Sequence, residues 1–596
     1  MTYRAWTERS AGARVRTILA LGICASVVAG LLHAGQLWVA VALGGFRWFS
    51  REFEWMAPVS YALVLLPAAA GLALVSIFAA HRAWLGFAVG SLTIGAVFGA
   101  LLPLTQLSRT SSLLLAAGAG VMAARWAIAA PERCSVVATR GALVSLVFVP
   151  MVALTQAWWF GVRESRAVAA LKAASPEAPN VLLVVLDAAR AKSLGFINAA
   201  AGTTPRLDQW ARGGVIFERA FAVAPWTLPS HASMMSGRYA GELSADWTVP
   251  VGRHHPVLAE LFRDAGYLTG GFVSNLHYTA YDTRLNRGFV HYDDYQVDWP
   301  QISRSSSYLQ TALADTLLRV PALGNLRAFL HPDLSIVRQH RYRSRLGAEV
   351  IDAFLDWESQ RGGRPFFAFL NLMDPHLVTT AADEDRRRYP HDHRGEPDYV
   401  AAMRYLDGEL DRLLATLETR GALERTVVII TADHGELLGE HGLEGHAQSA
   451  YKDVLHVPLF LRFPARAPGL TRIARAVSLR DLAATILDLS NVARGQLPGQ
   501  SLAALWRDSS AVVSPAIAEV RRQTNPLGTY PTASGALSAV FDERSYYIRN
   551  HGTGGEELFD YATDTGETTD RAKGIDAAAR LPPWRERLAT FLGARR

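Results

Sequence analysis

The sequence predicts an all-α bundle of about five apolar helices, followed by an α/β domain built on a mostly parallel sheet with helices on both sides. Two observations carry this prediction. Near residue 160 the composition changes from long uncharged runs of Ala, Leu, Val and Gly to an ordinary mixture of charged and apolar residues. Beyond that point, four apolar runs of strand length are separated by helical segments, which is typical of buried parallel strands.

At 596 residues the chain is too long for one ordinary domain. We expect a helical domain over residues 1–162, a polar, Ala-rich linker over 163–178, an α/β domain over 179–505 and a small α+β subdomain over 506–596. Residues 299–345 match no motif and are interpreted as an insertion near a membrane or over the site. The formal charge of +6 and the lack of a dense Lys/Arg run predict no nucleic-acid partner.

Only two cysteines are present, Cys24 in an apolar run and Cys134 in a polar loop, so we expect no disulfide between them. The second half of the chain has no cysteine, which excludes thiol chemistry and cysteine-bound metals there.

Five apolar runs are long enough to cross a hydrocarbon core of about 30 Å. They are residues 17–34 (or 17–45), 57–80, 83–105, 113–130 and 141–160. The alternative, core helices of a soluble domain, is disfavoured because five uncharged runs follow one another. Arginines are more numerous in the N-terminal tail and in the second and fourth loops than in the opposite loops. This bias predicts a cytoplasmic N-terminus and an external second half.

An uncleaved first span is favoured over a signal peptide, because no small-residue cleavage site follows it. We therefore expect an integral protein of the cytoplasmic membrane, with its α/β domain on the external or periplasmic side.

Each of the four strand-like runs ends at a metal- or anion-binding residue. The runs are residues 180–187, 269–275, 366–374 and 427–434, and their last residues include Asp187, Asn275, Asp374, Asp433 and His434. Ligands of open parallel sheets bind just beyond the carboxyl ends of the strands. We expect these side chains to meet there, in a polar site that packing does not explain, and the chain to be an enzyme.

Residues 225–237 predict a helix that begins close to Thr227, since Pro229 suits a first turn and Gly237 an exit. A hydroxyl at that position lies among free backbone N–H groups, which favour anions. Beside a metal it could act as a nucleophile. Alternatively, Thr227 is only a helix cap.

Asp433 and His434 directly follow an apolar strand and are good ligands for Mn²⁺ or Zn²⁺. A plain strand-to-helix turn with Asp433 as its cap is the alternative, and Asp187 has the same ambiguity. Arg190 could offer a forked donor to an oxyanion, or it could simply be solvated.

These segments, in this order, resemble the sulfatase branch of the alkaline phosphatase superfamily. The matching pieces run from about residue 179 to 567: PNVLLVVLDAAR, TTPRLDQWARGGVIFERAFA, WTLPSHASMMSGRY, LAELFRDAGYLTGGFVSN, RPFFAFLNLMDPH, TVVIITADHGELLGEHG, HVPLFLRF and ELFDYATDTGE. The resemblance implies an alkaline-phosphatase-like fold, with Asp187, Asp433 and His434 at metal-ligand positions and Thr227 at the nucleophile position.

The chain departs from that family in two places. Sulfatases proper carry a Cys or Ser in a C-x-P-x-R motif, whereas the segment starting at Thr227 reads TLPSH and ends on His231. Threonine there is similar to phosphoethanolamine transferases and lipoteichoic acid synthase, which also resemble this chain in having five membrane spans. Ala188 replaces a second aspartate, which implies one divalent ion (Mn, Zn, Ca or Mg) held by Asp187, Thr227, Asp433 and His434.

The resemblance leaves other roles open. A second ion could use Asp374, His376 and His446; otherwise His376 binds the ester oxygens or protonates the leaving group. Asn275 and His277 stand where the family has a Lys-x-x-His-like pair. His446 or His441 could be a general acid, although His441 could also be an exposed loop residue, and His231 is equally ambiguous.

We expect a metal-dependent enzyme that cleaves a phosphate or sulfate ester, of a lipid or a glycan, through Thr227. Two alternatives remain: a transferase of lipid head groups, and a non-catalytic relative that binds an anion or a partner.

Overall fold

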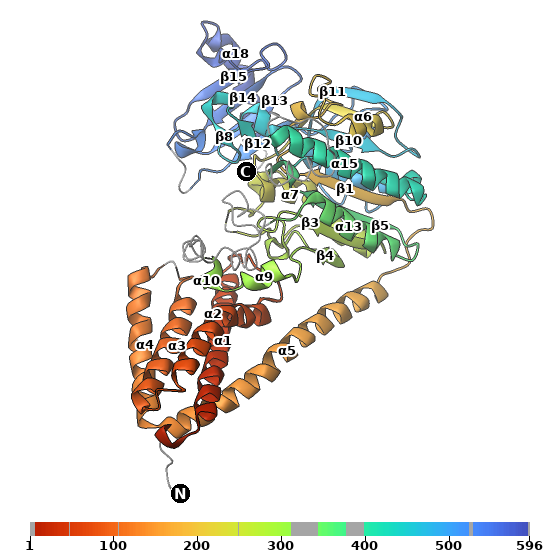
Figure 1. The fold of residues 1–596 in the computed structure, drawn as a ribbon. Coiled ribbons are helices and arrows are strands. Elements are labelled where there is room, and N and C mark those ends of the chain that lie inside the picture. The colour runs from red at the N-terminus through yellow and green to blue at the C-terminus, as the bar shows by residue number, and fades with distance from the viewer. Residues whose placement is uncertain are drawn as a thin grey trace. The chain divides into compact units, whose positions relative to one another are not determined.

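The computed structural model of the chain describes residues 6–46, 48–104, 106–247, 249–310, 344–376, 398–523 and 528–593. The described residues form two compact units (Figure 1). The first comprises those of Met1–Arg166 and Tyr295–Tyr342, and the second those of Ala167–Asp294 and Arg343–Arg596.

The first unit contains five long helices, each apolar and long enough to cross a membrane. They are α1 (Ala11–Ala42), α2 (Phe53–Val75), α3 (Arg82–Leu101), α4 (Arg109–Ala129) and α5 (Pro131–Ala169). Their apolar residues point outward as well as inward: Leu143, Val147 and Leu154 on α5 are 61%, 67% and 72% exposed. Helices that are apolar all round suit a hydrocarbon environment. The expectation of about five apolar helices is confirmed.

The end of α5 differs from the predicted linker. The helix continues through Ala169, so the first part of residues 163–178 is helical. Arg163, Glu164 and Arg166 are good helix formers and the segment is rich in Ala, so its polar composition does not interrupt the helix.

Two short helices of the predicted insertion, α9 (Trp299–Ser303) and α10 (Ser307–Gln310), belong to the first unit. The Ser60 hydroxyl of α2 donates to the Ser303 carbonyl over 2.6 Å, and Ser307 donates to the Gly99 carbonyl of α3 over 2.6 Å. The described start of the insertion, residues 299–310, therefore packs on the apolar helices. Residues 311–343 of the predicted insertion lie outside the described residues.

The second unit is built on a nine-stranded, mostly parallel sheet with the strand order β11-β2-β10-β6-β1-β5-β3-β4, and with β9 paired to β2. Only β9 and β10 pair antiparallel. The strands are β1 (Asn180–Leu186), β2 (Val215–Phe221), β3 (Leu268–Val273), β4 (His291–Asp293), β5 (Phe366–Leu372), β6 (Thr426–Thr431), β9 (His456–Val457), β10 (Leu459–Arg462) and β11 (Thr471–Ser478).

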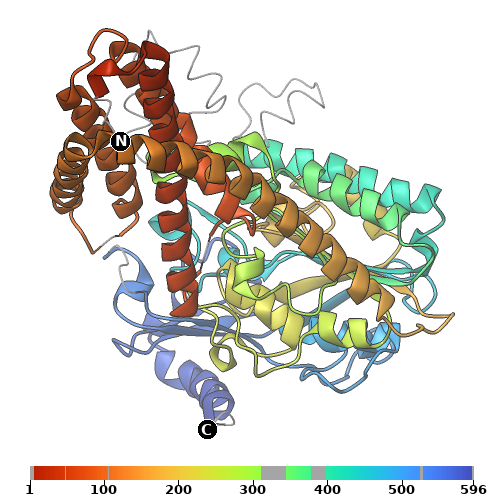
Figure 2. The ribbon, with the colours of Figure 1, turned by 90° about the horizontal axis from the view of Figure 1, so that it is seen from below.

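Every residue of β1, β5 and β6 is buried, because helices cover both faces of the sheet. Helices α13 (Gly347–Ser359) and α15 (Asp398–Thr419) lie side by side in both ribbon views (Figures 1 and 2). Helix α17 (Leu482–Ser490) packs against β1 and β6. Other described helices of this unit are α6 (Pro205–Ala211), α7 (Thr227–Ser236), α8 (Leu258–Asp264) and α16 (Lys452–Leu455).

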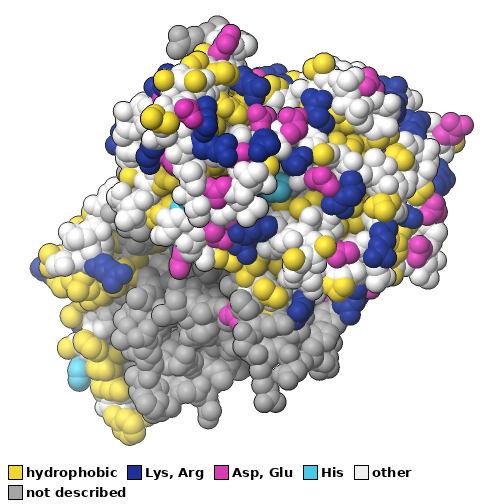
Figure 3. Space-filling model, turned by 90° about the horizontal axis from the view of Figure 1, so that it is seen from above, with side chains coloured by type: hydrophobic (Ala, Val, Ile, Leu, Met, Phe, Trp, Pro, Cys, Tyr) yellow, Lys and Arg dark blue, Asp and Glu magenta, His cyan; other side chains and the backbone are white. Residues whose placement is uncertain are grey.

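A four-stranded antiparallel sheet forms the C-terminal subdomain, with strands β12 (Ala516–Val520), β13 (Leu537–Phe541), β14 (Tyr546–Asn550) and β15 (Glu556–Phe559). Helix α18 (Ala577–Gly593) buries Leu581, Trp584 and Leu588 against it. In the upper part of the view in Figure 3, acidic and basic side chains are interspersed on the surface, as expected for contact with water, whereas hydrophobic side chains gather at the lower left. The predicted fold class is confirmed; the boundary between residues 505 and 506 stays a prediction.

A glycine at the turn before β4 allows this turn to lie against α8. Gly288 has φ +84°, and a Cβ there would lie 2.2 Å from the Glu260 nitrogen and 2.4 Å from the Ala259 carbonyl carbon. We expect Gly288→Ala to lower the free energy of unfolding by about 2–4 kcal/mol, through backbone strain and the clash. Gly495→Ala is the matched control, with φ +75° and open space, and should cost about 1 kcal/mol. Thermal unfolding of the purified chain measures both, and equal shifts would contradict the role of this contact.

Candidate active site

The order of the strands brings the polar residues together at one edge of the sheet. Strands β6, β1, β5 and β3 are consecutive neighbours and run parallel. Asp187 directly follows β1, Asp374 begins the turn after β5, and Asp433 and Asn275 each lie two residues beyond β6 and β3. All four side chains therefore emerge at the carboxyl edge, where ligands of such sheets bind.

Asp187, Asp433 and His434 form a fully buried group whose ligand atoms all lie within 4.8 Å of one another. His434 Nε2 is 3.7 Å from Asp187 Oδ1 and 3.4 Å from Asp433 Oδ2. Thr227 Oγ1 lies 3.4 Å from the same nitrogen. Asn275 Nδ2 donates to Asp187 Oδ2 over 2.9 Å and lies 3.4 Å from Thr227 Oγ1. The structure thus places five sequence-predicted site residues in one cluster.

The hydrogen bonds of His434 determine which ring nitrogen carries the proton. Its Nδ1 lies 2.8 Å from the Gly435 carbonyl, which can only accept, so Nδ1 donates. Burial lowers the pKa of His434 to about 3, so the ring is neutral near pH 7. Its Nε2 lone pair therefore points at the two carboxylates and the Thr227 hydroxyl. This arrangement is typical of a metal-ligating histidine oriented by its other nitrogen.

Two buried carboxylate oxygens of this group, Asp187 Oδ1 and Asp433 Oδ2, make no hydrogen bond with the described residues. Burial and the negative charge of Asp187 raise the pKa of Asp433 well above its usual range. Two carboxylates this close cannot both be ionised unless a cation lies between them. The unpartnered oxygens and the His434 lone pair fit a divalent ion, as expected for an O,O,N donor set.

The helix that presents Thr227 is α7. Trp226 is its N-cap and Thr227 its first residue, so the Thr227 hydroxyl does not serve as the cap. His231, one turn later, donates from Nδ1 to the Thr227 carbonyl over 2.8 Å, and Asn371 Nδ2 lies 3.4 Å from its Nε2. Ser230 donates to the Asp433 carbonyl over 2.6 Å. These bonds fix α7 to the strand ends and point Thr227 toward His434.

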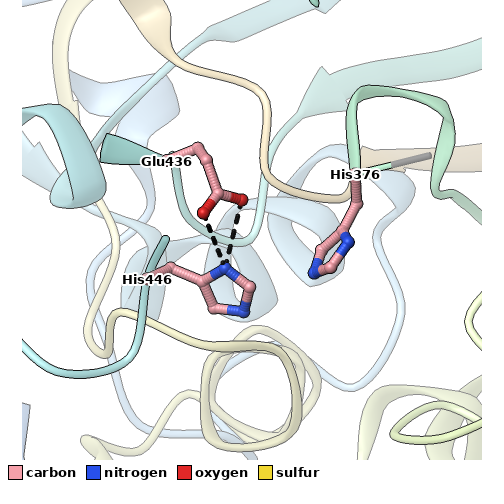
Figure 4. A group of neighbouring side chains, drawn as sticks. All are labelled: His376, Glu436 and His446. Atoms are coloured by element: carbon pink, nitrogen blue, oxygen red, sulfur yellow. Dashed lines mark hydrogen bonds and ion pairs between the residues drawn. The ribbon is translucent and has the colours of Figure 1, made fainter. Parts of the chain in front are cut away.

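A second group lies beside the first and comprises His376, Glu436 and His446, whose ligand atoms are also within 4.8 Å of one another (Figure 4). His446 Nδ1 is 3.1 Å from both Glu436 oxygens. The His446 ring stacks on His434 with centroids 4.4 Å apart, and lies 5.0 Å from the His376 ring. The two groups therefore form one continuous site.

Asp374 is not part of either group. Its Oδ1 accepts from the Gly347 N–H over 2.9 Å, and burial raises its pKa to about 7. Glu436 takes the place that sequence reasoning gave to Asp374. The sequence could have indicated Glu436 as a site residue, because it follows His434 by two residues in the same loop.

Arg190 is close to the site but is engaged elsewhere. Its guanidinium pairs with Glu440 over 3.0 Å, lies 3.3 Å from Ser193 Oγ, and stacks over the Tyr399 ring at 4.8 Å. Among the described residues no bond joins it to Thr227, so its role as an oxyanion donor stays a prediction.

The C-terminal subdomain reaches the loop that carries His446. His441 stacks on Tyr451, with ring centroids 3.7 Å apart, and its Nε2 lies 2.8 Å from Glu567 Oε2. Lys452 Nζ is 3.7 Å from the other Glu567 oxygen. His441 is an exposed loop residue, as one alternative expected, but its side chain is only 16% exposed because the ring is held by Tyr451 and Glu567.

A family model described as Sulfatase matches residues 179–492, more than half of the chain. The chain therefore belongs to the sulfatase family and is a sulfatase-like enzyme.

Among its relatives, the protein named "Uncharacterized sulfatase YidJ" of Escherichia coli K12 is 26% identical over 376 residues, which are 56% of this chain and 72% of that protein. The Delta 4,5-hexuronate-2-O-sulfatase of Bacteroides thetaiotaomicron is 24% identical over 440 residues, 67% of this chain and 86% of that protein. The crystal structure of the phosphonate monoester hydrolase of Agrobacterium radiobacter superposes with a TM-score of 0.52 at 19% identity, covering 70% of this chain and 96% of that one. At this identity the superposition shows the shared fold.

Glu567→Gln tests whether the subdomain holds the active-site loop. Loss of the charge-assisted bond to His441 should cost about 1–3 kcal/mol of stability and speed amide exchange in residues 437–446. Hydrogen-exchange mass spectrometry measures the second effect. Glu424→Gln removes a surface pair with Arg462 whose acid is 64% exposed, and should change little. Equal exchange in both variants would show that Glu567 does not anchor the loop.

Proposed function

We propose that this chain is a membrane-anchored, metal-dependent enzyme that cleaves a phosphate or sulfate ester through the hydroxyl of Thr227. One observation carries the proposal: Thr227 Oγ1 lies 3.4 Å from the His434 nitrogen, within a group that contains two buried, unpartnered carboxylate oxygens. Packing alone does not explain why these polar groups lie together at the edge of the sheet.

Asp187, Asp433, His434 and Thr227 would hold one divalent ion. When bound, the ion lowers the proton affinity of the hydroxyl and neutralises charge on the ester oxygens. Thr227 then attacks in line: its oxygen bonds to phosphorus or sulfur, the bond to the alcohol breaks, and its proton is released. Asn275 Nδ2, 3.4 Å from Thr227 Oγ1, is placed to donate to a non-bridging oxygen.

His446 is the better-supported proton donor for the leaving alcohol. Burial alone would lower its pKa, but the Glu436 carboxylate more than offsets this effect, so the pKa of His446 is raised. The carboxylate therefore favours the imidazolium form of His446, whose ring lies adjacent to His434. His376 remains a second donor or a contact for the ester oxygens. Water or an acceptor alcohol completes the cycle by attacking the threonine ester.

The residues around Thr227 favour phosphoryl transfer over sulfuryl transfer. The modifiable Cys or Ser and the Arg of the C-x-P-x-R motif are replaced by Thr227 and His231, and His231 is used to support α7. Relatives named for sulfated glycans and phosphonate esters support both ester classes for the proposal. A chromogenic phosphodiester assayed against a chromogenic sulfate decides between them.

The five apolar helices and the Lys/Arg bias support a cytoplasmic-membrane location with the sheet-containing unit outside. A membrane location favours the alternative of head-group transfer from a lipid to an envelope acceptor. Incubation with phospholipid labelled in its head group discriminates the two, since a hydrolase releases the label into water and a transferase moves it to an acceptor.

His376, Glu436 and His446 also form a donor set of two imidazoles and a carboxylate, which suits a second divalent ion. This alternative replaces the proposed Asp374 ligand with Glu436. Metal analysis of the purified chain tests this alternative. One ion per chain would leave His376, Glu436 and His446 available for acid catalysis, whereas two ions per chain would assign these residues to the second ion.

Thr227→Ala should reduce turnover by about 10³-fold or more, because it removes the hydroxyl that forms the covalent intermediate. Thr227→Ser keeps the hydroxyl and should retain much of the activity. Steady-state assays with the better of the two chromogenic esters measure both, and unchanged melting temperatures show that the fold is intact. Activity retained by purified Thr227→Ala refutes the nucleophile.

Glu436→Gln should move the alkaline limb of the kcat/KM profile to lower pH. The acid form of His446 is needed, it is lost as pH rises through its raised pKa, and removing the carboxylate lowers that pKa. The profile is recorded together with metal content. An unchanged limb argues against His446 as the acid, whereas loss of one of two bound ions assigns Glu436 to a metal.

A further inference from the structure

A cavity of about 590 Å³ lies at the amino edge of the main sheet, opposite the edge that carries Thr227. It is lined by the segment that leads into β1 and by the loops that precede β5 and β6, including Arg361, Arg364, Arg420 and Arg425. Strand β1 has seven residues, so about 20 Å of sheet separates this cavity from Asp187. It is not part of the proposed active site.

The cavity has an excess of positive charge. None of its lining residues is Asp or Glu. The carboxylate that pairs with these arginines is the buried Glu358, 3.0 Å from Arg361 and 2.8 Å from Arg420. Glu358 thus pairs with two of the four guanidiniums, and among the described residues no ion pair joins Arg364 or Arg425 to a carboxylate. The excess positive charge in this hollow favours an anion.

Two of the arginines keep unused donors. Arg364 donates from Nη1 to the carbonyls of Lys172 and Gly266, over 2.8 and 3.1 Å, and Arg425 donates from Nη2 to the Pro176 carbonyl over 2.9 Å. Their other guanidinium nitrogens have no partner in the part of the chain that the structure describes. These bonds to the linker and to Gly266 therefore use one nitrogen of each arginine. Arg361 and Arg420 also donate to backbone carbonyls, those of Arg364 and Leu355 over 2.7 and 2.8 Å.

We propose that this hollow, the arginine pocket, binds an oxyanion of the phosphate type. The planar guanidinium fork matches phosphate oxygens in a bidentate manner. Gly362, Gly363 and Gly421 line the pocket with open space where a Cβ would stand, so a ligand can approach the backbone there.

The phosphate could belong to an anionic lipid head group or to free phosphate. Helix α5 ends at Ala169, and the pocket begins at Ala173, so at most about 14 Å of chain separates them. Lys172 lies in this short connection, and Arg163 and Arg166 lie near the end of α5, where Glu164 offsets one of their charges. Basic segments next to a membrane span attract anionic lipids. The lipid source rests on the proposed membrane anchoring; the phosphate chemistry does not.

The test uses the full chain in nanodiscs of phosphatidylcholine, with or without phosphatidylglycerol, and calorimetric titration with inorganic phosphate. Native mass spectrometry counts the retained lipids. The variants are Arg425→Gln and the double variant Arg361→Gln/Arg425→Gln; neither residue is part of the active site. Arg494→Gln, which removes an exposed charge paired with Asp488, is the matched control.

We expect anion binding to weaken about tenfold in Arg425→Gln and further in the double variant, and to be unchanged in the control. Retention of phosphatidylglycerol alone identifies a lipid, and titration by phosphate identifies a soluble anion; both support the pocket. Binding of neither anion, or equal binding by all variants, overturns it. Thr227→Ala should bind the anion as the unmodified chain does. The binding result can therefore be interpreted even if the proposed catalysis is wrong.

Discussion

The arrangement of this enzyme depends on two carboxylates that lie close together in the protein interior. Asp187 and Asp433 end adjacent parallel strands, both are fully buried, and each leaves one oxygen without a hydrogen bond. Bringing two such groups into a protein interior costs several kcal/mol per charge unless a counter-charge accompanies them. If that counter-charge is a cation, it explains why His434 is neutral and why the strand order and Thr227 converge on the same place. The site is therefore electrostatically incomplete as protein alone.

Much of this was predictable from the sequence because strand ends are predictable. The apolar runs that end at Asp187 and Asp433 located both the sheet edge and its ligands, since parallel strands deliver their carboxyl ends to one place. The helix start at Thr227 was readable from Pro229 and Gly237. The pairing of side chains within loops could not be predicted from the sequence. The pairing of Glu436 with His446 depends on the path of a loop that turns at His441, which has φ +55°.

Other features could not be predicted from the sequence for similar reasons. Arg190 lies three residues from Asp187, but its direction is decided by Glu440, which belongs to a distant loop. The polar composition of residues 163–169 suggested a linker although helix propensity carried α5 onward. Packing of α9 and α10 on α2 and α3 follows from small contacts such as Ser60 with Ser303, which no periodicity reveals. Composition thus predicts which elements form, whereas tertiary contacts decide where connecting segments go.

Thr227 and His434 are 207 residues apart in the chain, yet they share one contact. During translation the hydroxyl emerges long before the imidazole that orients it, so a nascent polypeptide cannot capture its ion through this constellation. The contact forms only once β6 has inserted beside β1, late in synthesis. This order delays assembly of the candidate site until most of the polypeptide has been made.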